Sequence, residues 1–101
     1  EGIGTNQLTI HGGATLGGAT HRIGPDHIEV GSFIGLAAVT QSELRVERAG
    51  IEHLRSTLMG FARLGIECRT EGDDLIVPAE QSRLVQADLG GHVPTISDQP
   101  W

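Results

Sequence analysis

Apolar and polar residues alternate with a period of two in several short stretches of this chain, and that period is typical of β-strands. Residues 7–11 and 19–23 border glycine pairs and predict a β-hairpin. Residues 66–70 and 74–77 flank the turn sequence Glu71-Gly72-Asp73 and predict another. Residues 43–48 alternate regularly and predict a strand with one face exposed to solvent. In chain order, the predicted strands cover residues 7–11, 19–23, 43–48, 66–70, 74–77 and 84–88.

A helix is predicted directly after the break at Gly24-Pro25. Asp26 and Glu29, three residues apart, have the spacing of an N-terminal capping box. From Ile28 to Val39 the apolar residues cover nearly the whole circumference of this helix, and a helix that is apolar all round must be buried. We therefore expect it to run through the middle of a larger body.

A second helix is predicted from about 51 to 64, because its apolar residues form one stripe, and Gly65 is its natural C-terminal stop. In the first helix, Gly31 and Gly35 each cost about 1 kcal/mol of helix propensity relative to Ala, which close packing against another backbone would offset. The elements from the strand before Pro25 onward make a βαβαββ unit. We therefore predict an α+β fold in which a β-hairpin leads into one βαβαββ unit.

The composition of these 101 residues fits one small domain and restricts its partners. The chain is 38% hydrophobic but only 3% aromatic, so its core is expected to consist of Ile, Leu, Val and Ala. A formal net charge of -6 without a Lys/Arg cluster argues against nucleic acid and against an anionic membrane surface. No stretch approaches the roughly 18 apolar residues of a spanning helix, and no secretory signal is recognisable. A single cysteine, Cys68, fits a reducing compartment, so we expect a cytoplasmic protein.

Neither metal binding nor thiol chemistry is indicated by the pattern of ligating residues. Cys68 lies in a strand pattern with no neighbour that would lower its pKa, so it is expected to be a small packing residue. None of the short paired spacings of zinc sites occurs among the five histidines, which are His11, His21, His27, His53 and His92. We expect no metal and no cofactor.

The stretch from Gly24 to Phe33, Gly-Pro-Asp-His-Ile-Glu-Val-Gly-Ser-Phe, resembles a segment of the UDP-N-acetylglucosamine carboxyvinyltransferases, which belong to the enolpyruvyl transferase family. That segment reads Pro-Asp-Arg-Ile-Glu-x-Gly-Thr-Phe in many members, so His27 and Ser32 depart from the common residues. The similarity covers essentially the whole chain, including residues 1–6, 8–11, 16–18, 54–58, 64–66 and 74–77.

The resemblance implies a fold of two domains, each built from three βαβαββ units in an inside-out α/β prism. The helices of that fold point their N-termini toward the cleft between the domains. The family's chain crosses between domains close to the Pro-Asp motif. Residues 1–24 are therefore expected to end the first domain, and residues 25–101 to open the second.

The chemistry implied by the resemblance is transfer of the enolpyruvyl group of phosphoenolpyruvate to the 3-hydroxyl of UDP-N-acetylglucosamine, with release of phosphate, in peptidoglycan synthesis. Asp26 resembles an active-site aspartate at the cleft edge that orients the cationic groups holding phosphoenolpyruvate. An aspartate before an apolar helix is also an ordinary cap, so both interpretations of Asp26 remain open. For Glu29, capping is favoured over substrate binding.

Several family motifs are missing from this chain, so the fragment alone is expected to be inactive and to need the remainder of the parent chain. The missing motifs are a Lys-Asn pair, a loop with a reactive cysteine, an Asp-Leu-Arg motif and the Phe-Pro-x-Asp segment of the general base, a role that Asp98 does not fill. Alternatives are the related 3-phosphoshikimate 1-carboxyvinyltransferase and a noncatalytic βαβαββ binding or scaffold module. Self-association through the apolar helix is a further possibility.

Overall fold

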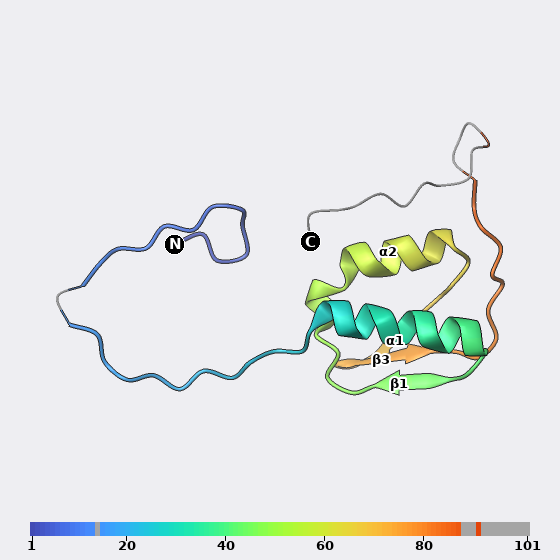
Figure 1. The fold of residues 1–101 in the computed structure, drawn as a ribbon, viewed down its shortest axis with the longest axis horizontal. Coiled ribbons are helices and arrows are strands. Elements are labelled where there is room, and N and C mark those ends of the chain that lie inside the picture. The colour runs from blue at the N-terminus through green and yellow to red at the C-terminus, as the bar shows by residue number, and fades with distance from the viewer. Residues whose placement is uncertain (14, 88–90, 92–101) are drawn as a thin grey trace.

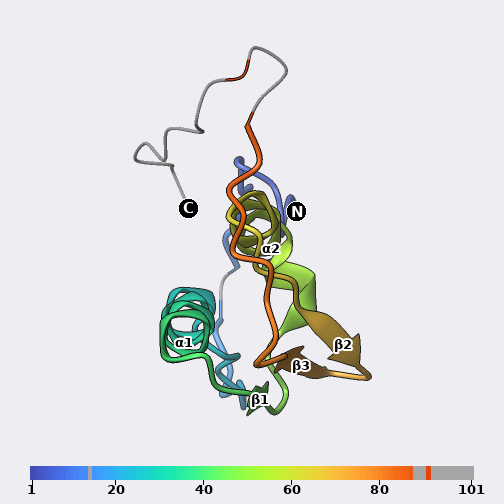
Figure 2. The same ribbon diagram turned by 90° about the vertical axis from the view of Figure 1, so that its right-hand side faces the viewer.

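The structure, a computed structural model, describes residues 1–13, 15–87 and 91. Strand β3 lies in the middle of a three-stranded sheet of order β1-β3-β2 and is antiparallel to both neighbours. Figures 1 and 2 show both helices on the same side of this sheet. The elements are α1 His27–Thr40, β1 Leu44–Val46, the 3₁₀ helix η1 Ile51–His53, α2 Arg55–Arg63, β2 Arg69–Glu71 and β3 Asp74–Val77. The predicted α+β class is confirmed.

The core lies between the inner flank of α1 and the sheet. Ile34 of α1, Leu54, and Leu75 and Val77 of β3 are completely buried. Burying one aliphatic side chain of this size contributes about 1.5–3 kcal/mol, so these contacts hold the helix on the sheet. The remaining buried members of the core are Val30, Ala37, Ala38, Ala49 and Ile66.

The opposite face of the sheet is polar, as the alternation in 43–48 predicts. Arg45 and Arg69 are both register partners of Ile76, so the three side chains share this face. Ile76 is nevertheless buried, which is expected when aliphatic arginine stems cover an apolar neighbour and keep their charged ends in water. The guanidinium of Arg45 bonds Asp74 Oδ2 at 2.9 Å and Glu71 Oε2 at 3.1 Å.

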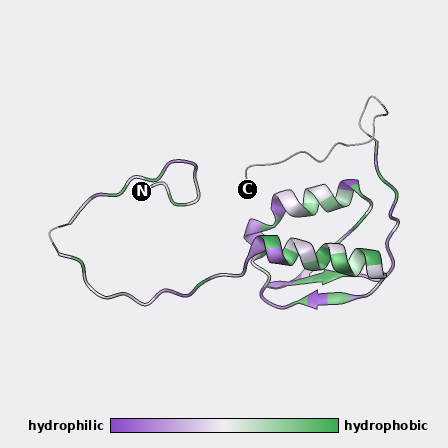
Figure 3. Ribbon diagram, in the orientation of Figure 1, coloured by the Kyte–Doolittle hydropathy of each residue, from purple (hydrophilic) through white to green (hydrophobic). Residues whose placement is uncertain are grey.

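The outer flank of α1 is apolar and open to water. Leu36 is 53% exposed and Val39 is 79% exposed, and Ile28 and Phe33 are also exposed. Figure 3 shows that hydrophobic residues make up most of this helix after a first turn of mixed character. The prediction that the helix is buried all round is therefore wrong for this chain by itself, because a three-stranded sheet covers one flank only.

The glycines of α1 lie where α2 approaches the helix. A Cβ built on Gly31 would lie 3.3 Å from Thr57 Cγ2, and one built on Gly35 would lie 3.8 Å from Phe61 Cζ. The two glycines therefore pack against side chains of α2, whereas the sequence analysis predicted close packing against another backbone. Together these residues border a mainly apolar groove of about 410 Å³ between the helices.

The predicted N-terminal hairpin is not formed. Residues 7–11 and 19–23 are exposed and contain no strand, and the arm that they belong to extends away from the sheet (Figure 1). An isolated two-stranded hairpin is marginal in water, and no sheet formed by the described residues lies beside this arm to support it. The expected first strand of the βαβαββ unit is therefore absent. Residues 84–87 also form no strand, and the rest of that predicted strand and the tail with His92 and Asp98 lie outside the described residues.

Gly65 ends α2 as predicted and also makes room for the returning chain. Its φ is +74°, and a Cβ there would lie 2.5 Å from the backbone nitrogen of Leu84. The Gly65 carbonyl accepts hydrogen bonds from the Ser82 hydroxyl and the Arg83 N–H, both at 3.1 Å. The Arg83 guanidinium then reaches the carbonyl of Ala38, near the C-terminal end of α1, at 3.3 Å.

We predict that Gly65→Ala lowers the free energy of unfolding by about 2 kcal/mol or more. Alanine is strained in the left-handed conformation of this residue, and its Cβ would also clash with the backbone of Leu84. Gly60→Ala is the matched control. Gly60 lies inside α2, and a Cβ there meets no atom within 4 Å, so alanine is expected to stabilise the chain by up to about 1 kcal/mol. Urea denaturation of both variants measures the difference, and equal effects would contradict this account of Gly65.

Candidate functional site

Asp26 is the N-cap of α1, as predicted. Its backbone is extended, and its Oδ1 accepts hydrogen bonds from the N–H groups of Ile28 at 2.8 Å and Glu29 at 3.3 Å. No return bond from the Asp26 N–H to the Glu29 carboxylate is present among the described residues, so only one half of the capping box forms. Glu29 still places a negative charge in the first turn, where the helix dipole favours it.

The approach to Asp26 is fixed by a contact between Pro25 and Gly50. Gly50 has a φ of +67°, and a Cβ there would lie 2.7 Å from Pro25 Cγ. Glycine therefore allows the proline ring to close against the chain just before η1. This contact determines where the arm of residues 1–24 leaves the body of the structure.

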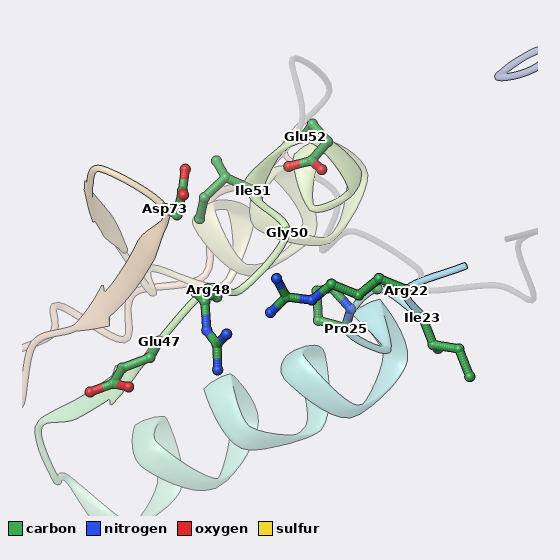
Figure 4. Close-up of a pocket in the computed structure, with 10 residues that line it drawn as sticks. Arg22, Ile23, Pro25, Glu47, Arg48, Gly50, Ile51, Glu52 and Asp73 are labelled. Atoms are coloured by element: carbon green, nitrogen blue, oxygen red, sulfur yellow. The ribbon is translucent and has the colours of Figure 1, made fainter. Parts of the chain in front are cut away.

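A hollow of about 550 Å³ lies beside this contact (Figure 4). Residues 22–25 form one side of it, and the turn between β1 and η1 forms the other. The lining residues are Arg22, Ile23, Gly24, Pro25, Glu47, Arg48, Gly50, Ile51, Glu52 and Asp73. Sequence reasoning did not single out Arg22 or Arg48, because they lie in different predicted elements and belong to no recognisable motif.

Asp74 holds the turn that carries Arg48. Its Oδ1 accepts the Arg48 backbone N–H at 2.9 Å, and the Ala49 N–H donates to the Asp73 carbonyl at 2.9 Å. The bond from the Arg48 N–H, followed by that from the Arg45 guanidinium, lowers the pKa of Asp74 below its ordinary value. The carboxylate therefore connects the sheet to the wall of the hollow.

The described residues offer no metal centre, because they contain no group of three or more His, Cys, Asp and Glu side chains arranged to hold an ion. Cys68 is half-buried, and burial raises the pKa of its thiol. A raised pKa disfavours the nucleophilic thiolate, which agrees with the predicted packing role. Within the described ranges, no helix has both the length and the apolar character needed to cross a bilayer.

Fold and site together define an α+β unit whose first helix is capped by an aspartate directly after a proline. The family model for EPSP synthase (3-phosphoshikimate 1-carboxyvinyltransferase) matches residues 1–97. The chain therefore belongs to the EPSP synthase family.

Three similar relatives share one name. The chain is 71% identical over its full length to the UDP-N-acetylglucosamine 1-carboxyvinyltransferase of Bradyrhizobium diazoefficiens and covers 23% of that protein. Enzymes of the same name from Treponema denticola and Bacteroides thetaiotaomicron are 48% and 44% identical over the full chain, which covers 24% and 23% of them. The chain thus spans about a quarter of the length of these relatives. No solved structure matches it significantly.

The lowered pKa of Asp74 predicts a specific acid sensitivity. Because the folded state binds this proton more weakly than the unfolded state, the carboxylate's contribution to stability is complete above its ordinary pKa of 3.8 and is lost as pH falls through the lower folded value. We expect Asp74→Asn to reduce stability at neutral pH and to flatten the pH dependence of unfolding below 3.8. Urea titrations across this range test the prediction, and a variant with an unchanged pH profile would refute it.

Proposed function

We propose that this chain is part of a transferase that moves the enolpyruvyl group of phosphoenolpyruvate to the 3-hydroxyl of UDP-N-acetylglucosamine, releasing phosphate, in peptidoglycan synthesis. The observation that carries the proposal is the 71% identity over all 101 residues to an enzyme of that name. The family model bears the name of the shikimate enzyme, but each relative compared above bears the name of the cell-wall enzyme. The free Cys68 is compatible with a cytoplasmic site of action.

In the proposed organisation, residues 1–24 end one domain and residues from 25 onward open the next. Two observations support this division. Residues 1–13 and 15–24 are exposed and join no sheet among the described residues, and Pro25 closes against Gly50 at the point where the arm meets the body. The remainder of the parent chain is then the partner that covers the exposed flank of α1.

Asp26 serves in this proposal both as helix cap and as cleft aspartate. Both cap bonds fall on its Oδ1, which leaves Oδ2 without a hydrogen bond among the described residues. A carboxylate oxygen in that position is suited to orient cationic groups of the parent protein, and those groups hold the phosphate of phosphoenolpyruvate. The positive end of the α1 dipole adds favourable potential for anions in the cleft. Glu29 contributes charge to the first turn and is not needed for substrate binding.

Asparagine and alanine at position 26 separate the two roles of Asp26. Asparagine caps helices about as well as aspartate, whereas alanine costs about 1 kcal/mol. In the complete enzyme we expect Asp26→Asn to keep nearly the original stability but to lose phosphate release by about tenfold or more, because the charge is gone. Asp26→Ala is expected to lower both the stability and the rate of phosphate release.

The measurements are phosphate release from phosphoenolpyruvate plus UDP-N-acetylglucosamine, and thermal unfolding of the same samples. Full activity of Asp26→Asn would show that Asp26 is a cap alone. The active-site role would then be withdrawn, while the transferase assignment would still stand.

A further inference from the structure

We propose that Asp74 is a positioning residue that holds the carboxylate of Asp26 in a fixed direction at the start of α1. The inference rests on the proposed function, in which one oxygen of Asp26 orients cationic groups of the parent protein. Asp74 begins β3 and Asp26 precedes α1, so the two residues are far apart in sequence. Short contacts nevertheless connect them through the turn between β1 and η1 and through Pro25.

Asp74 holds the backbone of Arg48 in a conformation that needs support. The φ of Arg48 is +50°, a left-handed region that residues other than glycine rarely adopt. Oδ1 of Asp74 accepts the Arg48 N–H at 2.9 Å, while Oδ2 accepts Nε–H of Arg45 at 2.9 Å. The two oxygens of one carboxylate therefore have separate partners, a turn and an ion pair. Removing the carboxylate leaves the left-handed turn without its side-chain bond.

The next two residues carry this constraint to Gly50. Ala49 is buried in the core, and its N–H donates to the Asp73 carbonyl at 2.9 Å. On the other side, the His53 N–H donates to the Gly50 carbonyl at 2.9 Å and so begins η1. Gly50 lies between an anchored turn and the first bond of η1, so its position follows that of the turn.

Gly50 in turn determines where Pro25 lies. A Cβ at Gly50 would lie 2.7 Å from Pro25 Cγ and 3.5 Å from Pro25 Cδ, so the proline ring rests directly on the glycine backbone. The ring also fixes the φ of Pro25, which passes the constraint to Asp26. Oδ1 of Asp26 is held by two N–H groups in the first turn of α1. The direction of Oδ2 is therefore set by the helix on one side and by the turn that Asp74 holds on the other.

A purely structural role of Asp74 is the alternative, and the kinetics of variants separate the two roles. A misplacement of about 1 Å can lower a rate by up to about 100-fold, even when it arises far from the reacting atoms. A positioning residue acts only through Asp26, so its removal costs no further activity once the Asp26 charge is gone. A residue that acts independently of Asp26 costs the same factor in either background.

The test is a double-mutant cycle in the complete enzyme, with phosphate release from phosphoenolpyruvate plus UDP-N-acetylglucosamine as the readout. Asp74→Ala is expected to lower kcat/KM roughly fivefold at a temperature where the variant remains folded. In the Asp26→Asn background it is expected to lower kcat/KM no further. Asp74→Asn should recover most of the activity, because its amide oxygen still accepts the Arg48 N–H. Equal fold losses in both backgrounds would overturn the proposal.

Arg45→Gln is the matched control for Asp74→Ala. It removes the ion pair with Asp74 but leaves the bond to the Arg48 N–H, so its kcat/KM should equal that of the original enzyme. Pro25→Ala interrupts the contact with Gly50 at an exposed position and should reproduce the loss seen in Asp74→Ala. Full activity of Pro25→Ala, or a loss in Arg45→Gln as large as in Asp74→Ala, would contradict positioning through the turn.

A second measurement does not depend on transferase activity. In this chain, a nuclear Overhauser effect between the Pro25 ring and the Gly50 Cα protons reports their contact. It should be present in the original chain and in Arg45→Gln, and it should be lost or strongly weakened in Asp74→Ala. An unchanged effect in Asp74→Ala refutes the positioning role alone. A complete enzyme that releases no phosphate refutes the proposed function instead, so the two failures are distinguishable.

Discussion

The packing of one flank of α1 on the three-stranded sheet is the constraint on which the rest of the structure depends. Ile34 of α1 packs in one core with Leu75 and Val77 of β3, so the helix cannot turn without opening that core. Its other flank carries Leu36 and Val39, which face water. A helix with apolar residues on both flanks needs two surfaces, and the part of the chain that the structure describes supplies one. The chain, which spans about a quarter of the length of its relatives, thus leaves one apolar flank of α1 exposed.

The same packing positions Pro25 and Asp26 at the start of α1. Asp74 begins β3 and, through its bond to the Arg48 N–H, fixes the turn that leads to Gly50. Gly50 in turn receives Pro25, and Asp26 follows as the cap of α1. Sheet, turn and helix N-terminus are thus connected by short contacts, each of which involves backbone. A rigid connection of this kind is what a side chain needs if it is to present one carboxylate oxygen in a constant direction.

Sequence patterns predicted the elements that local interactions determine. The cap at Asp26, the helix stop at Gly65 and the hairpin of β2 and β3 depend on residues close in sequence, and all three are present. The prediction of a hairpin from residues 7–11 and 19–23 was wrong. Its strands need a neighbouring sheet for stability, and an alternating pattern does not show whether such a sheet is present. The hollow beside Pro25 was missed because its two sides come together only after α1 and β1 have folded between them. Long-range juxtaposition of this kind leaves no local signal.

The central claim is that the rest of the parent protein covers the outer flank of α1, and Val39→Gln tests it most directly. Val39 is 79% exposed in this chain, and glutamine is a good helix former without charge. The free energy of unfolding should change by no more than about 0.5 kcal/mol in the isolated chain. In the complete protein it should fall by about 2 kcal/mol or more, because an amide would then be buried without a partner. The same small change in both proteins would contradict the claim.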